Sequence, residues 1–306
     1  MKVLITGGRG FLGTRLTNIL EKDKNIEFST FRSSELDLKS IDDTRAYFKT
    51  CRPDAVIHLA ARVGGIEFNK TRHAEQLYEN VTMLFNILEA ARNCECRKIV
   101  LCGSVCAYSG DAPVPFSEET GLYSGVPEKT VFGYGNAKRF FLTAAEAYRK
   151  QYGMEISLPI LANLYGPGDD FNLATCHVIP AMINRFSDCI KNGVEEVTFW
   201  GTGNASREFL YVDDAAEIII NCLERNIEIP FNVGSGEEIT MSELAELIGA
   251  LVGFKGKILW DTDKPDGHPR RKLDLNRFDT LFPHWKGTRL NDGLKSSVEY
   301  FRSMSS

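Results

Sequence analysis

A glycine repeat at the amino end of the chain constrains the fold more than any other feature. The run from Lys2 to Thr6 predicts a short buried strand, and Gly7, Gly10 and Gly13 follow it with the spacing Gly-x-x-Gly-x-x-Gly. Residues 11–20 then place leucines at helical spacing. A strand, a glycine turn and a helix in this order bring the backbone close to a pyrophosphate at the helix amino terminus. The pattern therefore predicts a dinucleotide site.

Strand and helix patterns alternate after this first unit. Predicted strands cover residues 2–6, 27–31, 55–59, 98–102 and 155–161, and predicted helices cover residues 11–20, 74–92 and a stretch that follows Tyr134. This alternation predicts an α/β fold, a Rossmann-type doubly wound parallel sheet with helices on both faces. After Asn163, Gly-Pro turns and shorter elements predict a smaller C-terminal α/β lobe over residues 164–306, with residues 207–233 returning to the first domain (1–163).

Composition and cysteine spacing narrow the class of protein. The 306 residues carry a net charge of −5, which argues against a general nucleic-acid-binding surface. The sequence shows no signal peptide and no apolar run that could span a bilayer. Its eight cysteines are scattered without the spacing of a zinc site or a redox dithiol. We therefore expect a cytoplasmic protein with no disulfide framework, no bound metal and no membrane contact.

The end of the second predicted strand bears on the choice of cofactor. NAD enzymes usually place an acidic residue there, to bond the ribose 2′-hydroxyl. This chain has Ser-Thr-Phe-Arg-Ser-Ser over residues 29–34, with no acid before Glu35. Arg32 can pair with a 2′-phosphate. The segment favours NADP(H), with an ordinary surface arginine as the alternative.

Three residues have the pattern of a carbonyl-reducing site. Tyr134 and Lys138 are four residues apart, which places them on one face of a helix. A lysine ammonium beside a phenol lowers the phenol pKa, so we expect Tyr134 to exchange a proton with a carbonyl oxygen near neutral pH. Ser104 follows the fourth strand and can bond the same oxygen. A chance, solvent-exposed Tyr-x-x-x-Lys is the alternative.

A thiol and an imidazole add a second chemistry. Cys106 lies two residues after Ser104, so at a strand end the two side chains are expected to point the same way. His177 stands at the start of the second lobe. Across a cleft, the two could remove and return protons at carbons next to a ketone. A buried inert thiol and a structural histidine are the alternatives.

These residues belong to longer motifs that resemble one family. The chain resembles the GDP-L-fucose synthases, which are bifunctional 3,5-epimerase/4-reductases of the extended short-chain dehydrogenase class, along nearly its whole length. The motifs are His58-Leu-Ala-Ala-Arg-Val-Gly-Gly65, Gly103-Ser-Val-Cys106, Tyr134 to Lys138, Asn163-Leu-Tyr-Gly-Pro167, His177-Val-Ile-Pro180, Trp200-Gly-Thr-Gly203, Arg207 to Asp214, Asn232 to Gly236 and Lys264 to Gly267.

The resemblance implies roles for particular positions. Ser104, Tyr134 and Lys138 would be the reductase triad, and Cys106 and His177 the epimerase base and acid. Arg185, Trp200, Arg207 and Asp266 would hold the nucleotide sugar. Cofactor contacts would come from Gly7, Gly8, Arg9, Gly10, Phe11, Leu12, Gly13, Arg32, Asp37, Leu38, Ala60, Ala61, Cys102, Gly103, Lys138, Leu161, Ala162, Asn163, Leu164 and His177. Relatives pair the helices near 74–92 and 134–150 into a four-helix bundle, which implies a homodimer.

The chain departs from the family pattern in two places. It has Gly-Ser-Val-Cys-Ala-Tyr-Ser where the family usually has Gly-Ser-Ser-Cys-Ile-Tyr-Pro, and its segment 116–132 lacks the usual Pro-Thr-Asn-x-x-Tyr run. The leading hypothesis is a GDP-linked 4-keto-6-deoxy sugar as substrate. The alternative is a 4-ketoreductase or epimerase acting on another nucleotide sugar without the double epimerisation. A dehydratase is disfavoured because no carboxylate follows Ser104, and a non-catalytic relative because Tyr134 and Lys138 are both present.

Overall fold

A five-stranded parallel sheet forms the centre of the first half of the chain. The computed structural model describes residues 1–173, 175–264 and 266–304, and of residues 66 and 67 it describes the backbone alone. The strand order is β2-β1-β3-β4-β6, and all neighbours run parallel. The strands are β1 (Lys2–Thr6), β2 (Glu27–Thr30), β3 (Ala55–His58), β4 (Lys98–Leu101) and β6 (Glu155–Ser157). The predicted Rossmann-type sheet is confirmed.

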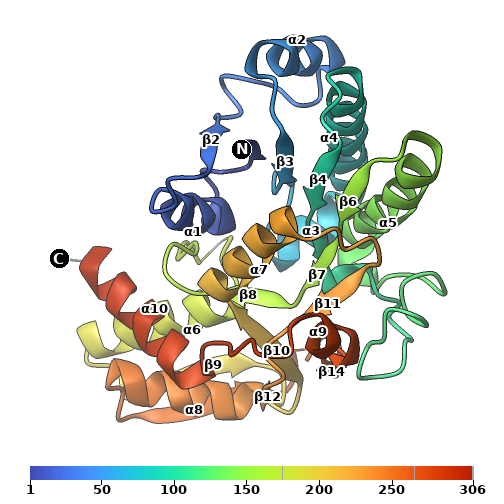
Figure 1. Cartoon of the computed structure of the whole chain (residues 1–306). Helices are drawn as coiled ribbons and strands as arrows, with labels where there is room; N and C mark the ends of the chain where they lie inside the picture. Colours follow the sequence, from blue (N-terminus) through green and yellow to red (C-terminus); the bar gives the residue numbers. More distant parts are fainter. Residues whose placement is uncertain (174, 265, 305–306) are drawn as a thin grey trace.

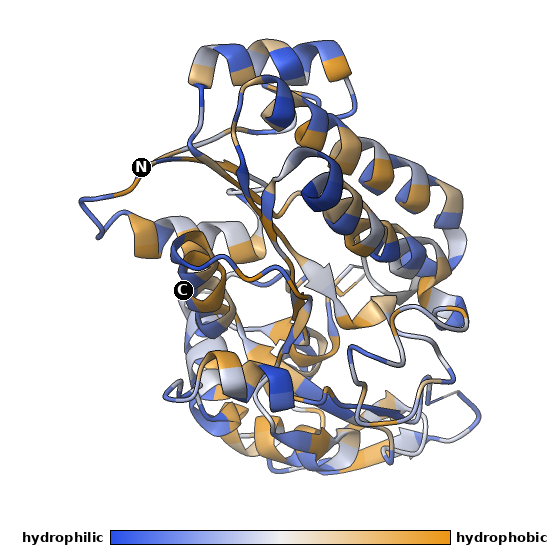
Figure 2. Ribbon diagram, turned by 45° about the vertical axis from the view of Figure 1, so that its right-hand side comes forward, coloured by the Kyte–Doolittle hydropathy of each residue, from blue (hydrophilic) through white to orange (hydrophobic). Residues whose placement is uncertain are grey.

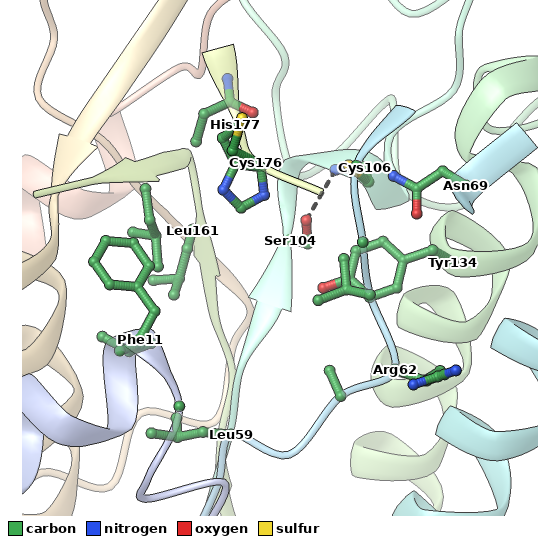
Figure 3. A pocket seen from close by; sticks show the side chains of 18 of the residues that line it. Phe11, Leu59, Arg62, Asn69, Ser104, Cys106, Tyr134, Leu161, Cys176 and His177 are labelled. Carbon is green, nitrogen blue, oxygen red and sulfur yellow. Dashed lines mark hydrogen bonds between the residues drawn. The ribbon is translucent and has the colours of Figure 1, made fainter. Parts of the chain in front are cut away.

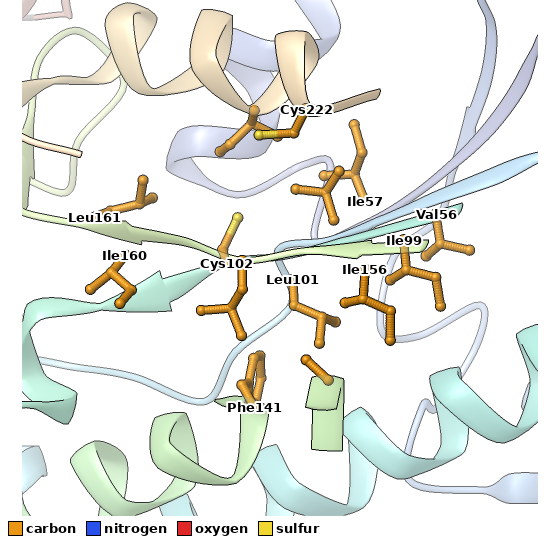
Figure 4. Packing of buried hydrophobic residues seen from close by; sticks show 14 of the residues in the cluster. Val56, Ile57, Ile99, Leu101, Cys102, Phe141, Ile156, Ile160, Leu161 and Cys222 are labelled. Carbon is orange, nitrogen blue, oxygen red and sulfur yellow. The ribbon is translucent and has the colours of Figure 1, made fainter. Parts of the chain in front are cut away.

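Helices cover both faces of this sheet (Figure 1). Figure 4 shows Cys222 of α7 on one side of the strands and Phe141 of α5 on the other, both within a continuous buried apolar cluster. On the α7 side lies α1; on the α5 side lie α2 and α4. The bounds are α1 (Phe11–Leu20), α2 (Ile41–Cys51), α3 (Ile66–Thr71), α4 (His73–Asn93), α5 (Phe132–Tyr152) and α7 (Val212–Glu224).

The fifth predicted strand, over residues 155–161, is interrupted in the structure. Its first part, β6, pairs with β4, and its second part, β7 (Pro159–Leu161), pairs with β5 (Gly103–Ser104) and β11 (Phe231–Val233) in a separate sheet. Val100 pairs with Ser157 and Gly103 with Ile160, so the register does not change across the break. The residue left out of both strands is Leu158, and Pro159, which follows it, has no N–H to donate to a neighbouring strand; this accounts for the interruption before Pro159.

The second lobe has its own buried core. Residues of this core include Phe186, Phe199, Leu244 and Ile248, all nearly inaccessible. Figure 1 shows α6, α8 and α10 surrounding its short sheets, and Figure 2 shows apolar residues concentrated on the central strands. The remaining elements are η1 (Val105–Ala107), η2 (Lys129–Val131), β8 (Asn163–Tyr165), α6 (Val178–Lys191), β9 (Glu196–Trp200), β10 (Ser206–Tyr211), β12 (Glu238–Thr240), α8 (Met241–Val252), β13 (Lys257–Asp261), β14 (Arg270–Arg271), α9 (Asn276–Leu281) and α10 (Leu290–Met304).

The chain passes between the two cores more than once. Strand β10 pairs with β8, the following helix α7 packs on α1, and β11 pairs with β7. Phe278 of α9 also belongs to the first core. These contacts accord with a return of residues 207–233 to the first half, while the domain boundary at residue 163 stays a prediction. In the part of the chain that the structure describes, no helix is both long enough and apolar enough to cross a membrane.

Candidate active site

One large cavity lies where the parallel strands end, between the two lobes. Its volume is about 2150 Å³. Its lining includes every residue for which the sequence predicts a role in binding or reaction: Gly7, Gly8, Arg9, Gly10, Phe11, Leu12, Gly13, Arg32, Asp37, Leu38, Ala60, Ala61, Cys102, Gly103, Ser104, Cys106, Tyr134, Lys138, Leu161, Ala162, Asn163, Leu164, His177, Arg185, Trp200, Arg207 and Asp266. The structure thus brings the whole predicted set together in one place.

The glycine loop at one end of the cavity has a geometry that only glycine allows. Gly7 has φ of +70°, and a Cβ there would lie 2.7 Å from the backbone nitrogen of Ala60. A Cβ on Gly13 would lie 2.1 Å from the carbonyl oxygen of Gly7. Helix α1 starts after Gly10 with no side chain capping its first N–H groups. These open N–H groups and the narrow turn fit a dinucleotide pyrophosphate.

The loop after β2 borders the same end of the cavity. Arg32 and Arg9 are both exposed there, and the backbone N–H of Arg32 donates to the Glu35 carboxylate at 2.7 Å. Within the described residues, the Arg32 guanidinium forms no ion pair. The side-chain amide of Asn86 on α4 donates to the carbonyl of Leu38 at 2.8 Å, which holds this loop against α4. Two exposed guanidinium groups therefore border this end of the cavity, and such groups can pair with a phosphate.

Ser104 and Cys106 reach the cavity by a route that differs from the prediction. The alternation of a strand end was expected to align their side chains, but β5 ends at Ser104 and Cys106 lies in the 3₁₀ turn η1. The Ser104 hydroxyl accepts the backbone N–H of Cys106 at 3.2 Å. The serine thus caps the turn that carries the thiol. Both side chains line the cavity because of this turn and not because side chains alternate along a strand (Figure 3).

Tyr134 and Lys138 lie on the first turns of α5, facing the sheet. Both are buried, at 9% and 4% exposure. Glycines before and after Tyr134 let the helix approach its neighbours, since a Cβ on Gly133 would lie 2.2 Å from the His73 carbonyl oxygen. The Lys138 ammonium donates to the carbonyl oxygen of Cys102 at 2.7 Å and lies 4.1 Å from the ring centroid of Phe141. The lysine is therefore fixed in position beside the end of β4.

The protonation of the two residues is governed by burial. Burial lowers the pKa of Lys138 to about 8. Burial also raises the pKa of Tyr134; the nearby Cys106 adds to this rise, and the Ser104 hydroxyl opposes it. The expectation that Lys138 lowers the tyrosine pKa is therefore wrong for this structure. Lys138 Nζ lies 5.7 Å from the Tyr134 ring centroid and bonds a carbonyl, so desolvation of the phenol prevails.

His177 enters the cavity from the opposite lobe. It immediately precedes α6, and in the view of Figure 3 Ser104 lies between His177 and Tyr134. Its Nδ1 lies 3.3 Å from Oδ1 of Asp169, a carboxylate whose side chain is only 4% exposed. The hydrogen bond to Asp169 raises the pKa of His177, against the effect of its burial. The imidazole is 53% exposed, so it remains accessible from the cavity.

The far end of the cavity carries arginines and an exposed tryptophan. Trp200, at the end of β9, is 62% exposed. Arg185 of α6 donates to the Thr198 carbonyl at 3.2 Å. Burial, reinforced by the neighbouring Arg271, lowers the pKa of Arg207 to about 10. The Asp266 carboxylate accepts from the N–H and hydroxyl of Thr202 at 2.6 and 2.8 Å. Its neighbour at position 265 lies outside the described residues.

Sequence reasoning missed four residues near the reaction site. Asp169 bonds His177, and Asn69, Glu128 and Arg271 line the cavity. Glu128 pairs with Arg271 at 3.2 Å, which joins the loop before α5 to the second lobe. Asp169 follows β8 only four residues after the strand ends, where site residues of such folds gather, so its position was an available signal. The others lie in the short helix α3, in β14 and just before η2, and nothing in their spacing indicates the cavity.

Comparison with known proteins agrees with this geometry. The sequence model of the NAD dependent epimerase/dehydratase family matches residues 3–234. GDP-L-fucose synthase 1 of Arabidopsis thaliana is 36% identical over 302 residues, which cover 98% of this chain and 93% of the relative. GDP-L-fucose synthase of Escherichia coli (strain K12) is 35% identical over 310 residues, covering 98% and 96%. The chain belongs to the GDP-L-fucose synthase family.

The fold agrees with that family as well. A crystal structure of a GDP-L-fucose synthetase from Naegleria fowleri bound to NADP superposes with a TM-score of 0.90 at 29% identity, covering 99% of this chain and 93% of that one. The superposition extends over both halves of the chain. The predicted family and the predicted fold class are therefore both confirmed.

Proposed function

We propose that this family member is an NADPH-dependent enzyme that epimerises carbons 3 and 5 of a GDP-linked 4-keto-6-deoxy sugar and then reduces carbon 4. The proposal depends on one observation above all. Proton-transfer groups from three separate parts of the chain, the η1 turn, α5 and the loop before α6, line one cavity together with the glycine loop. The names of the relatives, which are GDP-L-fucose synthases, support the choice of sugar and nucleotide.

The cofactor proposal is supported at both ends of the dinucleotide. The open N–H groups at the start of α1 can hold the pyrophosphate, and Arg32 and Arg9 can pair with the 2′-phosphate. When bound, NADPH supplies the hydride that reduces carbon 4. Lys138 and the residues at the ends of β3 and β7 then contact the nicotinamide half. The similar N. fowleri synthetase was crystallised with NADP.

Ser104 and Tyr134 are assigned to the ketone oxygen. The Ser104 hydroxyl can donate a hydrogen bond to this oxygen, which stabilises the negative charge that develops on it. The raised pKa of Tyr134 keeps the phenol protonated at neutral pH, so it can give its proton to the oxygen as carbon 4 receives the hydride. Lys138 re-forms the neutral tyrosine indirectly, since its ammonium, with a pKa lowered to about 8, can release a proton near neutral pH.

Cys106 and His177 are assigned to the epimerisation. The ketone acidifies the protons on carbons 3 and 5. One group removes such a proton and leaves an enolate, whose oxygen Ser104 and Tyr134 stabilise, and the other returns a proton to the opposite face. The two groups come from the η1 turn and from the loop before α6. This arrangement provides a base on one side of the sugar and an acid on the other.

The nucleotide half of the substrate is assigned to the second lobe. The guanidinium groups of Arg185 and Arg207 suit a diphosphate, and the exposed ring of Trp200 offers a flat apolar surface to a base or sugar. Asp266 can contact the substrate only through the lone pairs that its bonds to Thr202 leave open.

The proposal includes a cytoplasmic homodimer. All eight cysteines are free thiols, as in a reducing compartment. Tyr78 of α4 and Phe140 of α5 expose large apolar side chains, at 67% and 45%, on a pair of helices packed against each other. Two such pairs can form a four-helix interface.

Replacing Cys106 tests the proposed function. Reactions are run in deuterated water with GDP-4-keto-6-deoxymannose and NADPH, and the product is analysed by NMR and mass spectrometry. The wild-type product should carry deuterium at carbons 3 and 5. Cys106→Ser should lose this incorporation but still reduce a ketone slowly, because a serine hydroxyl is too weak an acid to serve as the base. Cys176→Ser is the matched control, since Cys176 lines the same cavity.

Two results would contradict the assignment. If Cys106→Ser incorporates deuterium at the wild-type rate, Cys106 is a packed thiol and another group is the base. If the wild-type enzyme reduces the ketone without any incorporation, the chain is a simple 4-ketoreductase and the double epimerisation is wrong.

A further inference from the structure

A buried carboxylate lies behind the imidazole that faces the substrate. We propose that Asp169 is a positioning residue, which holds His177 through the Nδ1 hydrogen so that Nε2 faces the sugar. This inference rests on the proposed function for its catalytic meaning, but the contact itself can be measured without any substrate. The carboxylate and the ring are joined by a 3.3 Å hydrogen bond between Oδ1 and Nδ1.

The surroundings of Asp169 leave His177 as its partner. The side chain is 4% exposed, and its Oδ1 also accepts the backbone N–H of Asp170 at 2.8 Å. Its Oδ2 is buried without a hydrogen bond, and no lysine or arginine of the described chain forms an ion pair with it. A buried carboxylate is costly unless a cation or several donors face it. Protonated His177 is the cation that this position provides.

The loop that carries Asp169 is built to keep it in place. It leaves β8 through Gly166 and Gly168, which have φ of +146° and +94°, conformations that other residues rarely adopt. Farther along, Asp170 accepts the backbone N–H of Asn172 at 2.9 Å and bonds the Thr175 hydroxyl. The turn before Asp169 and the hydrogen bonds after it therefore restrict the direction from which Asp169 meets His177.

The charge of Asp169 opposes a second effect on His177. His177 caps the amino end of α6, where the helix dipole disfavours a positive imidazole. Against this stand the carboxylates of Asp169 and Asp170, and the hydrogen bond to Asp169 is the largest influence raising the His177 pKa. Both carboxylates come from the loop after β8, and Cys176, which precedes His177, is a further titratable group beside it. The carboxylate thus favours the protonated form of the imidazole, which is the form that donates a proton.

A bond at Nδ1 also fixes which nitrogen does the chemistry. Because Asp169 accepts from Nδ1, the neutral imidazole keeps its hydrogen there and its lone pair is on Nε2. Nε2 lies on the side of the ring away from Asp169, and the imidazole is 53% exposed toward the cavity. After His177 donates a proton from Nε2, the same nitrogen is ready to accept another.

The experiment follows His177 directly by NMR. The chain has five histidines, and comparison with His177→Asn assigns the signal. In the wild-type protein, the nitrogen shifts of the neutral ring should show the hydrogen on Nδ1, and the titration midpoint should fall in Asp169→Asn. Asp170→Asn is the matched control, because it removes a charge from the same loop but leaves the bond to His177. Its midpoint should move much less.

Enzyme kinetics then connect the contact to the reaction. In Asp169→Asn, deuterium incorporation at carbons 3 and 5 should slow by about tenfold or more. The alkaline limb of its pH–rate profile, where activity falls as the acid loses its proton, should lie at lower pH than in the wild type. Reduction of a ketone that already has the product configuration should be nearly unchanged. Asp169→Glu should restore part of the lost rate.

Each outcome bears on the proposal. An unchanged midpoint in Asp169→Asn, or a wild-type neutral ring with its hydrogen on Nε2, overturns it; the second measurement needs no variant to fold. A lowered midpoint together with slowed epimerisation supports it. A lowered midpoint in an enzyme whose wild type exchanges no protons supports the contact and refutes the proposed epimerase.

Discussion

The imidazole of His58 is fully buried at the end of β3, under the reaction site. Its Nδ1 lies 2.7 Å from the Thr6 hydroxyl, and its ring stacks on Phe141 with centroids 5.7 Å apart. Burial, and then the nearby Lys138 ammonium, lower the pKa of His58 to about 3. An unfolded chain protonates this histidine at its ordinary pKa of about 6.5. Between these values the unfolded state binds more protons, so stability is lost as the pH falls.

This sign leads to a measurable difference in unfolding. Between about pH 7 and pH 5, wild-type protein should lose on the order of 2 kcal/mol more unfolding free energy than His58→Gln, which cannot titrate there. Urea unfolding followed by fluorescence at both pH values gives the two differences. Equal losses in the two proteins would show that His58 does not stay neutral in the folded state.

Arg32 carries the prediction of cofactor choice. Arg32→Ala should weaken NADPH binding by about tenfold to a hundredfold, which corresponds to the loss of a charge-assisted contact of about 1.5–3 kcal/mol, and should change NADH binding little. Isothermal titration with both cofactors measures this. Arg72→Ala is the control, because Arg72 is exposed but does not line the cavity. If Arg32→Ala weakens the binding of NADPH and NADH equally, Arg32 does not pair with the 2′-phosphate.

At this scale the sequence predicts which residues meet but not how they are charged. Ser104 could be named because it follows a predicted strand, Tyr134 because it precedes a predicted helix, and His177 because it stands at the start of the predicted second lobe. The direction of the Tyr134 pKa could not, because it depends on how completely α5 covers the phenol. Asp169 went unnoticed because an acidic residue after a Gly-Pro turn is common, and only the folded loop places it against an imidazole.

Helix α5 also organises the loop that precedes it. The guanidinium of Arg139 donates to the carbonyl oxygens of Ala107 and Gly125 at 2.7 Å each, and to those of Ser124 and Gly121 at 3.0 and 3.4 Å. One side chain thus joins the η1 turn, which carries Cys106, to the segment that departs from the family pattern. This contact ties the loop to the helix that carries Tyr134 and Lys138.

Removing this side chain should loosen the loop without unfolding the helix. In Arg139→Leu, local opening of residues 108–125 should become easier by about 1.5–3 kcal/mol, so chymotrypsin should cleave after Tyr123 about tenfold faster or more. Tyr123 is 61% exposed and suits this assay. Arg149→Leu is the control, since Arg149 lies on the same helix and its guanidinium donates to the Ile156 carbonyl at the other end of α5. Equal cleavage rates would contradict the clamp.

The ends of helices and strands could be predicted where apolar residues recur with a clear period. They were harder to predict where a single residue ends the element. The glycine loop, α1 and the five strands of the sheet follow from runs of apolar residues. The break at Pro159 and the turn at Val105–Ala107 depend on one missing N–H and one serine cap. Such a strand break or turn can be predicted only when the pairing of the neighbouring strands is known.

Helices α4 and α5, which pack against each other, both expose large apolar side chains. Tyr78 and Phe85, seven residues apart on α4, lie on one helical face and are 67% and 37% exposed, and Phe140 of α5 is 45% exposed. Monomeric proteins seldom leave large apolar side chains grouped in this way. A second copy placed against this surface would bury them.

Charges on this surface should therefore separate the subunits. Light scattering at micromolar concentration should give a dimer mass for the wild type and a monomer mass for Tyr78→Glu combined with Phe140→Glu. Leu259→Glu is the control, because Leu259 is 41% exposed on the second lobe, away from α4 and α5. A monomeric wild type, or a double variant that remains a dimer, would refute this interface.

The chain alternates between the two cores, and this determines whether it can be cut into fragments that fold. The second core takes residues 165–199, the first takes 215–233, the second 244–252, the first 273–282 and the second 290–298. A fragment that ends at residue 163 would therefore lack the helix and strand that complete its own interior, and the remaining fragment would expose them. Neither piece should be soluble when made alone, because each would expose part of an apolar core. The two halves on either side of the cavity should therefore fold and unfold together.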